Sequence, residues 1–135
     1  MLNRAPFKQA TNKTQIIENY KLGTHYCRKQ YEKGGVAMYV HKNIQCTKVS
    51  IDTYCKEKDI EICMIKFTYH ELKISIITLY RSPTGNFDSF LCNLEGVLQV
   101  LYDPTIAIII CGDINVDYRV ENERKKAIKH FTPFI

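Results

Sequence analysis

Two strand-like segments separated by only two residues constrain the fold of this chain most. Residues 60–69 (IEICMIKFTY) and 72–81 (LKISIITLYR) flank the pair His70-Glu71. So short a connection predicts an antiparallel hairpin, although the pair is not one of the favoured glycine-containing turns. Apolar residues fall on both parities of each segment, so both faces of the hairpin are expected to be covered, which places these strands inside a sheet.

The segments before and after this hairpin extend the pattern. Residues 35–41 (GVAMYVH) predict a short strand introduced by a glycine pair, and residues 47–51 predict a weaker one. In residues 87–101 apolar side chains recur at spacings of three and four, which predicts an amphipathic helix. Asn86 is the expected N-cap of this helix, and Pro104 is expected to end it.

The last apolar run of the chain is residues 106–111 (IAIIIC), which read as a central strand buried on both sides. A short helix is expected around residues 120–131. The resulting order of four strands, a helix, a strand and a helix favours an α/β sandwich. One continuous core is expected to contain Ile62, Ile65, Ile76, Leu79, Leu94, Leu98, Ile108 and Ile110.

Composition limits the class of protein. The 135 residues, 45% of them hydrophobic and 24% charged, suit one globular domain or a large piece of one. Residues 1–15 are polar and aperiodic, so a loop or disordered end is expected there. No apolar run reaches the length of a membrane span, and residues 1–9 hold no apolar core of a signal peptide. An intracellular protein that does not enter a membrane is therefore expected.

Neither the cysteines nor the histidines indicate a metal site. The six cysteines are Cys27, Cys46, Cys55, Cys63, Cys92 and Cys111. No Cys-x-x-Cys pair occurs, which disfavours zinc, and both Cys63 and Cys111 lie in apolar strand-like runs. Reduced, mostly buried thiols are therefore expected rather than a disulfide framework. His25, His41 and His70 have no partners at metal-ligand spacing.

The net charge of +5 is compatible with a polyanionic partner. Basic side chains gather in residues 21–33 and 124–129. Because net charge informs partners only weakly, a solvated surface is the favoured interpretation of these runs taken alone, with a nucleic-acid contact as the alternative.

The end of the apolar run at residues 106–111 carries the most informative polar residues. Gly112, Asp113 and Asn115 follow it, at the strand end where α/β enzymes commonly place reactive groups. In extended geometry Asp113 and Asn115 leave the same face, since they are two residues apart. A carboxylate beside a carboxamide can align a water molecule and hold a phosphate oxygen. The alternative, favoured by spacing alone, is that both residues turn the chain.

A second polar pair, Tyr80-Arg81, stands at the end of the segment 72–81. A phenol hydroxyl can donate to a phosphate oxygen, and a guanidinium suits phosphate because it can bind in a bidentate manner. The alternative, favoured when this segment is read by itself, is a packed strand end closed by Pro83.

Taken together and in order, these segments resemble the endonuclease/exonuclease/phosphatase superfamily. The likeness is carried by GGVAMYV, YRSP, GDIN and the amphipathic helix between the last two. Within the superfamily the chain is most similar to the apurinic-type endonuclease domains of non-LTR retrotransposons, over about residues 17–118. The resemblance implies a four-layered α/β sandwich, with two mixed β-sheets packed face to face and helices outside.

The same resemblance implies hydrolysis of DNA phosphodiesters with Mg²⁺ as cofactor. Asp113 would align or deprotonate the attacking water, Asn115 would hold the nucleophile and the phosphate, and Tyr80 would donate a hydrogen bond to the scissile phosphate. Arg81 is assigned a substrate contact, to the nucleic-acid backbone. DNA is the implied partner, a reverse transcriptase on the same parent polyprotein is a second one, and the nucleus is the implied place of action.

Two parts of the family pattern are not recognised in this sequence. The family's metal-binding Glu precedes the segment that holds Glu18, so no residue is assigned as a metal ligand. A C-terminal Ser-Asp-His is not found either, and His130, in a basic helical segment, is not expected to be catalytic. Residues 1–135 are therefore expected to be a single partial domain, truncated at both ends and weak or inactive alone. The alternatives are a catalytically inactive remnant with at most weak nucleic-acid binding and, more remotely, a phosphatase acting on lipid or nucleotide phosphates.

Overall fold

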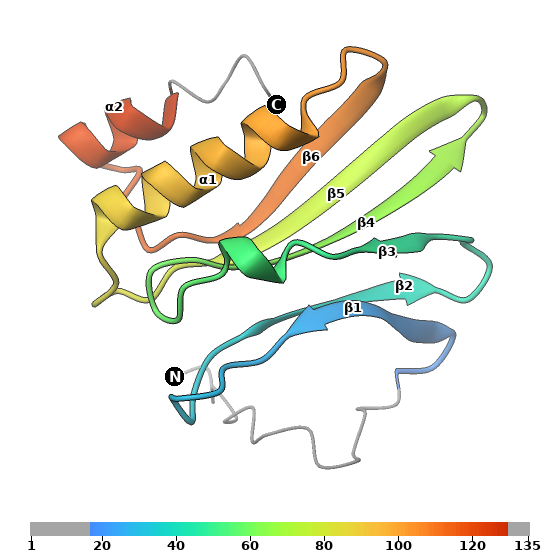
Figure 1. The fold of residues 1–135 in the computed structure, drawn as a ribbon, viewed down its shortest axis with the longest axis horizontal. Helices are drawn as coiled ribbons and strands as arrows, with labels where there is room; N and C mark the ends of the chain where they lie inside the picture. The colour runs from blue at the N-terminus through green and yellow to red at the C-terminus, as the bar shows by residue number, and fades with distance from the viewer. Residues whose placement is uncertain (1–16, 130–135) are drawn as a thin grey trace.

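The computed structural model describes residues 17–129, which form an α/β fold with two sheets and two α-helices (Figure 1). The elements in chain order are β1 (Tyr20–Tyr26), β2 (Val36–His41), β3 (Thr47–Val49), a 3-10 helix (Asp52–Tyr54), β4 (Glu61–Tyr69), β5 (Leu72–Tyr80), α1 (Phe87–Leu101), β6 (Ile106–Asp113) and α2 (Glu123–Lys129). β1 and β2 form a two-stranded sheet, and the four-stranded sheet has the order β3-β4-β5-β6. The expectations for residues 1–15, for His130 and for the end of the last helix lie outside the described residues.

The predicted hairpin of β4 and β5 is confirmed. The two strands pair antiparallel from Glu61↔Tyr80 to Tyr69↔Leu72, and they are the two inner strands of their sheet. His70 and Glu71 both have positive φ angles, of 44° and 67°, as both central residues of a type I′ turn must. The short connection therefore determined the hairpin even without a glycine in it.

The predicted helix and its cap are also confirmed. Asn86 caps α1, since its side-chain oxygen accepts a hydrogen bond from the Ser89 backbone N–H at 2.8 Å. The apolar stripe of α1 covers one face of the four-stranded sheet (Figure 1). This core contains Ile51, Ile60, Ile62, Met64, Ile77, Leu79, Phe90, Leu94, Val97 and Leu98, with Ile108 and Ile110 partly buried against it.

The expectation of one continuous core was wrong for Ile65 and Ile76. These two residues pair across β4 and β5, and they alternate with Met64 and Ile77 of the core, so their side chains lie on the opposite face of the sheet. The two-stranded sheet approaches that face, because a Cβ placed on Gly23 of β1 would lie 3.6 Å from Ile65 Cγ2. The hairpin is thus covered on both faces, by two different sets of side chains.

The expectation of a central position for residues 106–111 was wrong. β6 pairs only with β5, in parallel, and is an edge strand of the described sheet. Ile108 and Ile110 face the core, whereas Ala107, Ile109 and Cys111 are exposed, Ile109 by 47%. A continuous apolar run specifies a strand that can be buried on both sides, but it does not specify its neighbours.

The strand β1 was not expected from the sequence. Its pairing with β2 shifts register between Leu22 and Thr24, at Gly23. A Cβ on Gly23 would lie 2.7 Å from Val40 Cγ2 of β2, so the glycine allows the two strands to approach at this irregularity. Because this irregularity interrupts the two-residue alternation of side chains along β1, the sequence pattern did not predict the strand.

The cysteines differ in part from expectation. All six are free thiols, but only Cys63 is buried; Cys92 and Cys111 are exposed and the others are half-buried. Cys111 lies on the uncovered face of β6, and Cys92 lies on an exposed part of α1. The prediction that the thiols are mostly buried was therefore wrong. For Cys111 the reason is that the described residues cover only one face of β6.

Candidate functional site

The candidate site is a row of three side chains across the four-stranded sheet. Glu61 of β4 is paired with Tyr80 of β5, and Tyr80 is paired with Asp113 of β6. Side chains directly opposite one another in paired strands lie on the same face. The structure thus brings Tyr80 and Asp113 together at the ends of β5 and β6, and it adds Glu61, which the sequence did not single out.

Asn115 reaches this site by a turn rather than by extended backbone. Its φ angle is positive, at 51°, so the expectation that Asp113 and Asn115 leave one face of an extended strand was wrong. The Asp113 carboxylate accepts a hydrogen bond from the Asn115 backbone N–H at 2.9 Å, as in an Asx-turn. The Asn115 side-chain amide donates to the Arg81 carbonyl at 2.5 Å. Asp113 and Asn115 therefore turn the chain, as the alternative interpretation of the sequence predicts, and their polar groups still lie close together.

Arg81 is buried with a relative exposure of 0% and joins the loops that follow β5 and β6. Its Nε donates to the Ile114 carbonyl at 2.8 Å and its Nη2 to the Asn115 carbonyl at 2.9 Å. Its Nη1 donates to the carbonyls of Ser82 and Gly85. Burial lowers the pKa of the Arg81 guanidinium, and the nearby positive charge of Arg124 adds to this effect. In this arrangement the side chain positions the Asp113–Asn115 turn against the end of β5.

Glu61 is fully buried, and its carboxylate holds the segment between β1 and β2. Its Oε1 accepts from Arg28 Nε at 2.5 Å and from the Lys58 backbone N–H at 3.0 Å. Its Oε2 accepts from the Gly35 backbone N–H at 2.5 Å. The side chains of Arg28 and Glu61 are only 7% and 0% exposed, so this is a buried ion pair with additional hydrogen bonds. In the sequence, the only sign of this ion pair is the acidic Glu61 at the start of a mostly apolar strand.

Arg28 connects this ion pair to Tyr80. Its guanidinium carbon lies 5.8 Å from the centroid of the Tyr80 ring, within the range of a cation–π contact. Its Nη1 donates to the Lys33 carbonyl. Its Nη2 is buried and has no hydrogen-bond acceptor among residues 17–129. Arg28 therefore adds a positive charge and an unused donor beside Tyr80, the middle residue of the row.

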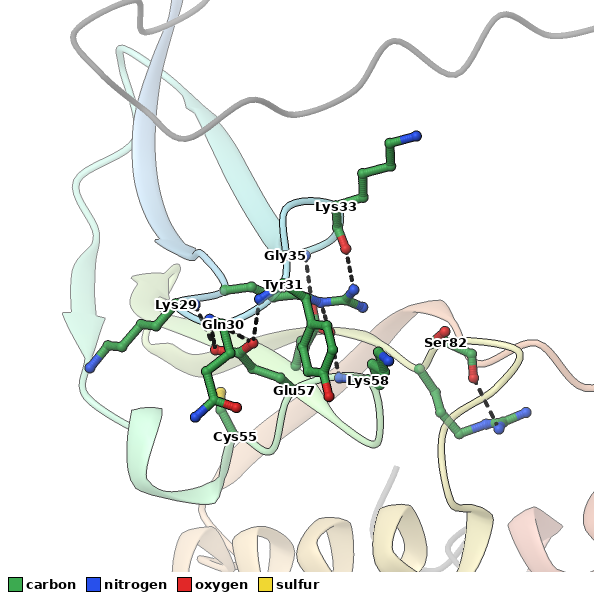
Figure 2. Close-up of polar contacts among 12 residues, drawn as sticks. Lys29, Gln30, Tyr31, Lys33, Gly35, Cys55, Glu57, Lys58 and Ser82 are labelled. Atoms are coloured by element: carbon green, nitrogen blue, oxygen red, sulfur yellow. Dashed lines mark hydrogen bonds and ion pairs between the residues drawn. The ribbon is translucent and has the colours of Figure 1, made fainter.

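Residues 28–35, which we call the Arg28 loop, are held by a second carboxylate (Figure 2). Glu57 accepts hydrogen bonds from the consecutive backbone N–H groups of Lys29, Gln30 and Tyr31, at 2.5 to 3.2 Å. Burial acts to raise the pKa of Glu57, but these hydrogen bonds outweigh it and keep the pKa below its ordinary value. Lys58 stacks on the Tyr31 ring, with Nζ 3.7 Å from the centroid. The loop is thus fixed at its middle by Glu57 and at its ends by Glu61.

The described residues do not form a metal centre on their own. No group of at least three His, Cys, Asp or Glu residues gathers at metal-binding distance within residues 17–129. Glu61, the carboxylate in the same row as Asp113, is already bound to Arg28 and to two backbone N–H groups. Asp113 is therefore the carboxylate of the row with the capacity to take a further ligand.

Among the helices of residues 17–129, none is long and apolar enough to cross a membrane. Comparison of the chain with known protein families, with curated proteins and with solved structures found no match.

Proposed function

We propose that this chain is the central part of a DNA endonuclease domain that hydrolyses phosphodiesters, of the kind carried by non-LTR retrotransposons. The motifs YRSP and GDIN support the proposal by resemblance. The observation that carries it is the pairing of Tyr80 with Asp113 in the parallel register of β5 and β6. Two motifs that lie far apart in the sequence thus supply a hydrogen-bond donor and a carboxylate to one place.

These groups suit attack by water on a phosphodiester. Asp113 acts as the base or as the group that orients the water, because it is the strand partner of Tyr80, which would hold the phosphate. Tyr80 donates its hydroxyl proton in a hydrogen bond to a phosphate oxygen. The Asn115 amide nitrogen is engaged by the Arg81 carbonyl, which leaves the amide oxygen to orient the water. Arg81 keeps the two strand ends in register, because it is fully buried and donates to four backbone carbonyls. Its contact to the nucleic-acid backbone rests on the resemblance alone.

The implied cofactor is Mg²⁺. Protein sites for Mg²⁺ commonly use one or two carboxylates together with waters and substrate phosphate oxygens. Within residues 17–129, Asp113 is one such carboxylate, but no group of three ligating side chains accompanies it. The described residues therefore do not fit a complete magnesium centre, and the steps above depend only on groups of this chain.

The family fold is part of the same proposal. Two observations agree with a sandwich of two sheets with helices outside. The helix α1 packs on one face of the four-stranded sheet, and β1 approaches Ile65 on the other face. Action on DNA in the nucleus, beside a reverse transcriptase of the same polyprotein, follows from the retrotransposon resemblance alone.

A second candidate function is a catalytically inactive remnant with weak nucleic-acid binding. The commitment of Glu61 to Arg28 favours it, because this removes a carboxylate from the row. The basic residues of α2 add little to such binding. Lys125, Lys126 and Lys129 already form ion pairs with Glu121 and Glu123.

A plasmid-nicking assay with Mg²⁺ tests the proposal. The chain itself should nick slowly or not at all, and a version extended at both ends in the same reading frame should nick faster. General acid–base catalysis contributes about 10² to 10⁴-fold, so Asp113→Ala should lower the rate by that order. Asp117→Ala is the matched control, since Asp117 is an exposed carboxylate in the same loop that pairs with Arg119. No nicking by either version would favour the inactive remnant, and equal measurable rates in Asp113→Ala and the parent would contradict the role of Asp113.

A further inference from the structure

We infer that Arg28 binds a phosphate oxygen beside Tyr80, the middle residue of the row, by the Nη2 donor that has no partner among the described residues. The inference deepens the proposed function and rests on it, because it assigns the phosphate of the phosphodiester to one side chain outside the two recognised motifs. It starts from the hydrogen bonds of a single guanidinium.

The Arg28 guanidinium is fixed on two of its three nitrogens. Nε donates to Glu61 at 2.5 Å, and Nη1 donates to the Lys33 carbonyl. The side chain is 7% exposed. Held in this way, the guanidinium cannot turn to satisfy Nη2 elsewhere, and no acceptor among residues 17–129 lies within hydrogen-bonding distance of that nitrogen. Buried polar groups without a partner are rare in folded proteins, and each one calls for a physical reason.

The location of this donor points to an anion. Glu61 already receives the Arg28 charge and the backbone N–H groups of Lys58 and Gly35, so its negative charge is balanced within the protein. The guanidinium that carries the remaining donor has its central carbon 5.8 Å from the centroid of the Tyr80 ring, and the hydroxyl of Tyr80 is also a donor. Two donors of which one is cationic match a phosphate oxygen, since charge-assisted bonds from arginine to phosphate are short and strong.

The Arg28 loop controls access to the donor. Gly34 has a φ of 135° and lies on the guanidinium, where a Cβ would overlap Arg28 atoms including Nη2. An oxygen that approaches Nη2 past Gly34 therefore requires this glycine to shift, and the absence of a side chain there leaves it room to do so. The next residue, Gly35, donates its N–H to Glu61 and would sense the same shift. Phosphate binding should thus be visible at the amides of both glycines.

The test is a titration followed by NMR on the full chain without metal and at constant ionic strength. Inorganic phosphate, a mononucleotide and a short single-stranded oligonucleotide are the three ligands. Saturable shifts of the Arg28 Nε–H signal and of the Gly34 and Gly35 amides are expected, with the oligonucleotide binding more tightly than inorganic phosphate. Binding of inorganic phosphate without the oligonucleotide would assign the site to free phosphate and overturn a contact to phosphodiesters. Shifts confined to exposed lysines would overturn the inference entirely.

Two variants that differ in net charge separate a specific contact from general attraction. Arg28→Gln, combined with Glu61→Gln so that no buried charge is left unpaired, keeps the net charge and should weaken binding by about tenfold or more. Lys33→Gln lowers the net charge by one but keeps the carbonyl that receives Nη1, and it should change the Kd by less than about twofold. A loss confined to Lys33→Gln would show that general attraction, and not the Arg28 contact, holds the ligand. If the double variant does not fold, the shift of the Arg28 Nε–H signal in the parent chain decides.

The outcome is separable from that of the proposed function. Saturable oligonucleotide binding at Arg28 without any nicking would uphold the inference and count against the endonuclease. Nicking by the extended chain with an unchanged KM in Arg28→Lys would uphold the endonuclease and overturn the role of Arg28.

Discussion

Tyr80 of β5 lies opposite Asp113 of β6, in the last residue pair of their parallel register. A backbone hydrogen bond holds the two strand ends together at the next residue: the Arg81 N–H donates to the Asp113 carbonyl at 2.9 Å. The phenol and the carboxylate therefore share one end of the sheet through backbone geometry, and they do not depend on a flexible loop for their proximity.

The first prediction concerns Gly112, just before Asp113. Its φ is 140°, and a Cβ there would overlap the Leu79 carbonyl oxygen. Gly112→Ala should therefore lower the free energy of unfolding in urea by about 1–3 kcal/mol or more. The matched control is Gly96→Ala inside α1, where the nearest neighbour is Tyr54 Cε1 at 3.6 Å. It should be neutral or stabilising, by up to about 1 kcal/mol. Equal effects of the two substitutions would contradict the packing described for Gly112.

The second prediction concerns the buried ion pair. Glu61→Gln leaves the Arg28 charge buried without its partner, which should cost about 3–5 kcal/mol of unfolding free energy. Glu123→Gln breaks an exposed pair with Lys126, which solvent screens, and it should have a far smaller effect on the unfolding free energy than Glu61→Gln. Chemical denaturation of both variants checks this. A small effect in Glu61→Gln would mean that the Arg28 loop is not held by this carboxylate.

The third prediction concerns thiol reactivity. Burial raises the pKa of Cys63 to about 12, and only a thiolate reacts with iodoacetamide at an appreciable rate. Cys92 and Cys111 are exposed. At pH 8 the native chain should be alkylated at these two cysteines first and at Cys63 last, as mass spectrometry of the peptides would show. Early labelling of Cys63 would contradict the burial of its side chain.

The fourth prediction concerns acid stability through Asp59. Its Oδ1 accepts from the Asn86 backbone N–H at 2.7 Å, and its Oδ2 lies 3.0 Å from Lys56 Nζ. Burial acts to raise the pKa of Asp59, but these contacts outweigh it and lower the pKa. A lowered carboxyl pKa gives stability above the unfolded value of about 3.9, which is lost as the pH falls through the folded value.

The unfolding free energy should therefore fall as the pH drops from about 5 to about 2. In Asp59→Asn this fall should be shallower, and the variant should already be less stable at neutral pH. Denaturation series at several pH values provide the comparison. Identical slopes in the two proteins would show that the Asp59 contacts do not persist in solution.

Local sequence determined the parts of this fold that depend on neighbours in the chain. The two-residue connection at His70-Glu71 specified the hairpin, and the spacing of apolar residues after Asn86 specified α1 and its cap. The pairing of segments that are far apart in the chain could not be predicted from such local patterns. The edge position of β6 and the bulged strand at Gly23 depend on which segments meet, which a single sequence does not encode in any local period.

The residues of the candidate site could be predicted only in part, for the same reason. Tyr80 and Asp113 were found because each ends a recognisable strand, and their strands proved to be neighbours. Glu61 and Arg28 were missed because their importance comes from a contact across 33 residues, between a strand and a loop. The charged residue at the start of an otherwise apolar strand was the available signal.

The most direct test of the central claim is a double-mutant cycle on Mg²⁺-dependent nicking by the chain extended at both ends. If Tyr80 and Asp113 act on one phosphate, Tyr80→Phe and Asp113→Asn should each lower kcat/KM, by up to about 10² to 10⁴-fold for Asp113. The double variant should then lose much less than the product of the two effects, because the groups act as a unit. Unchanged kcat/KM in both single variants, or losses that simply multiply, would contradict a shared site at the ends of β5 and β6.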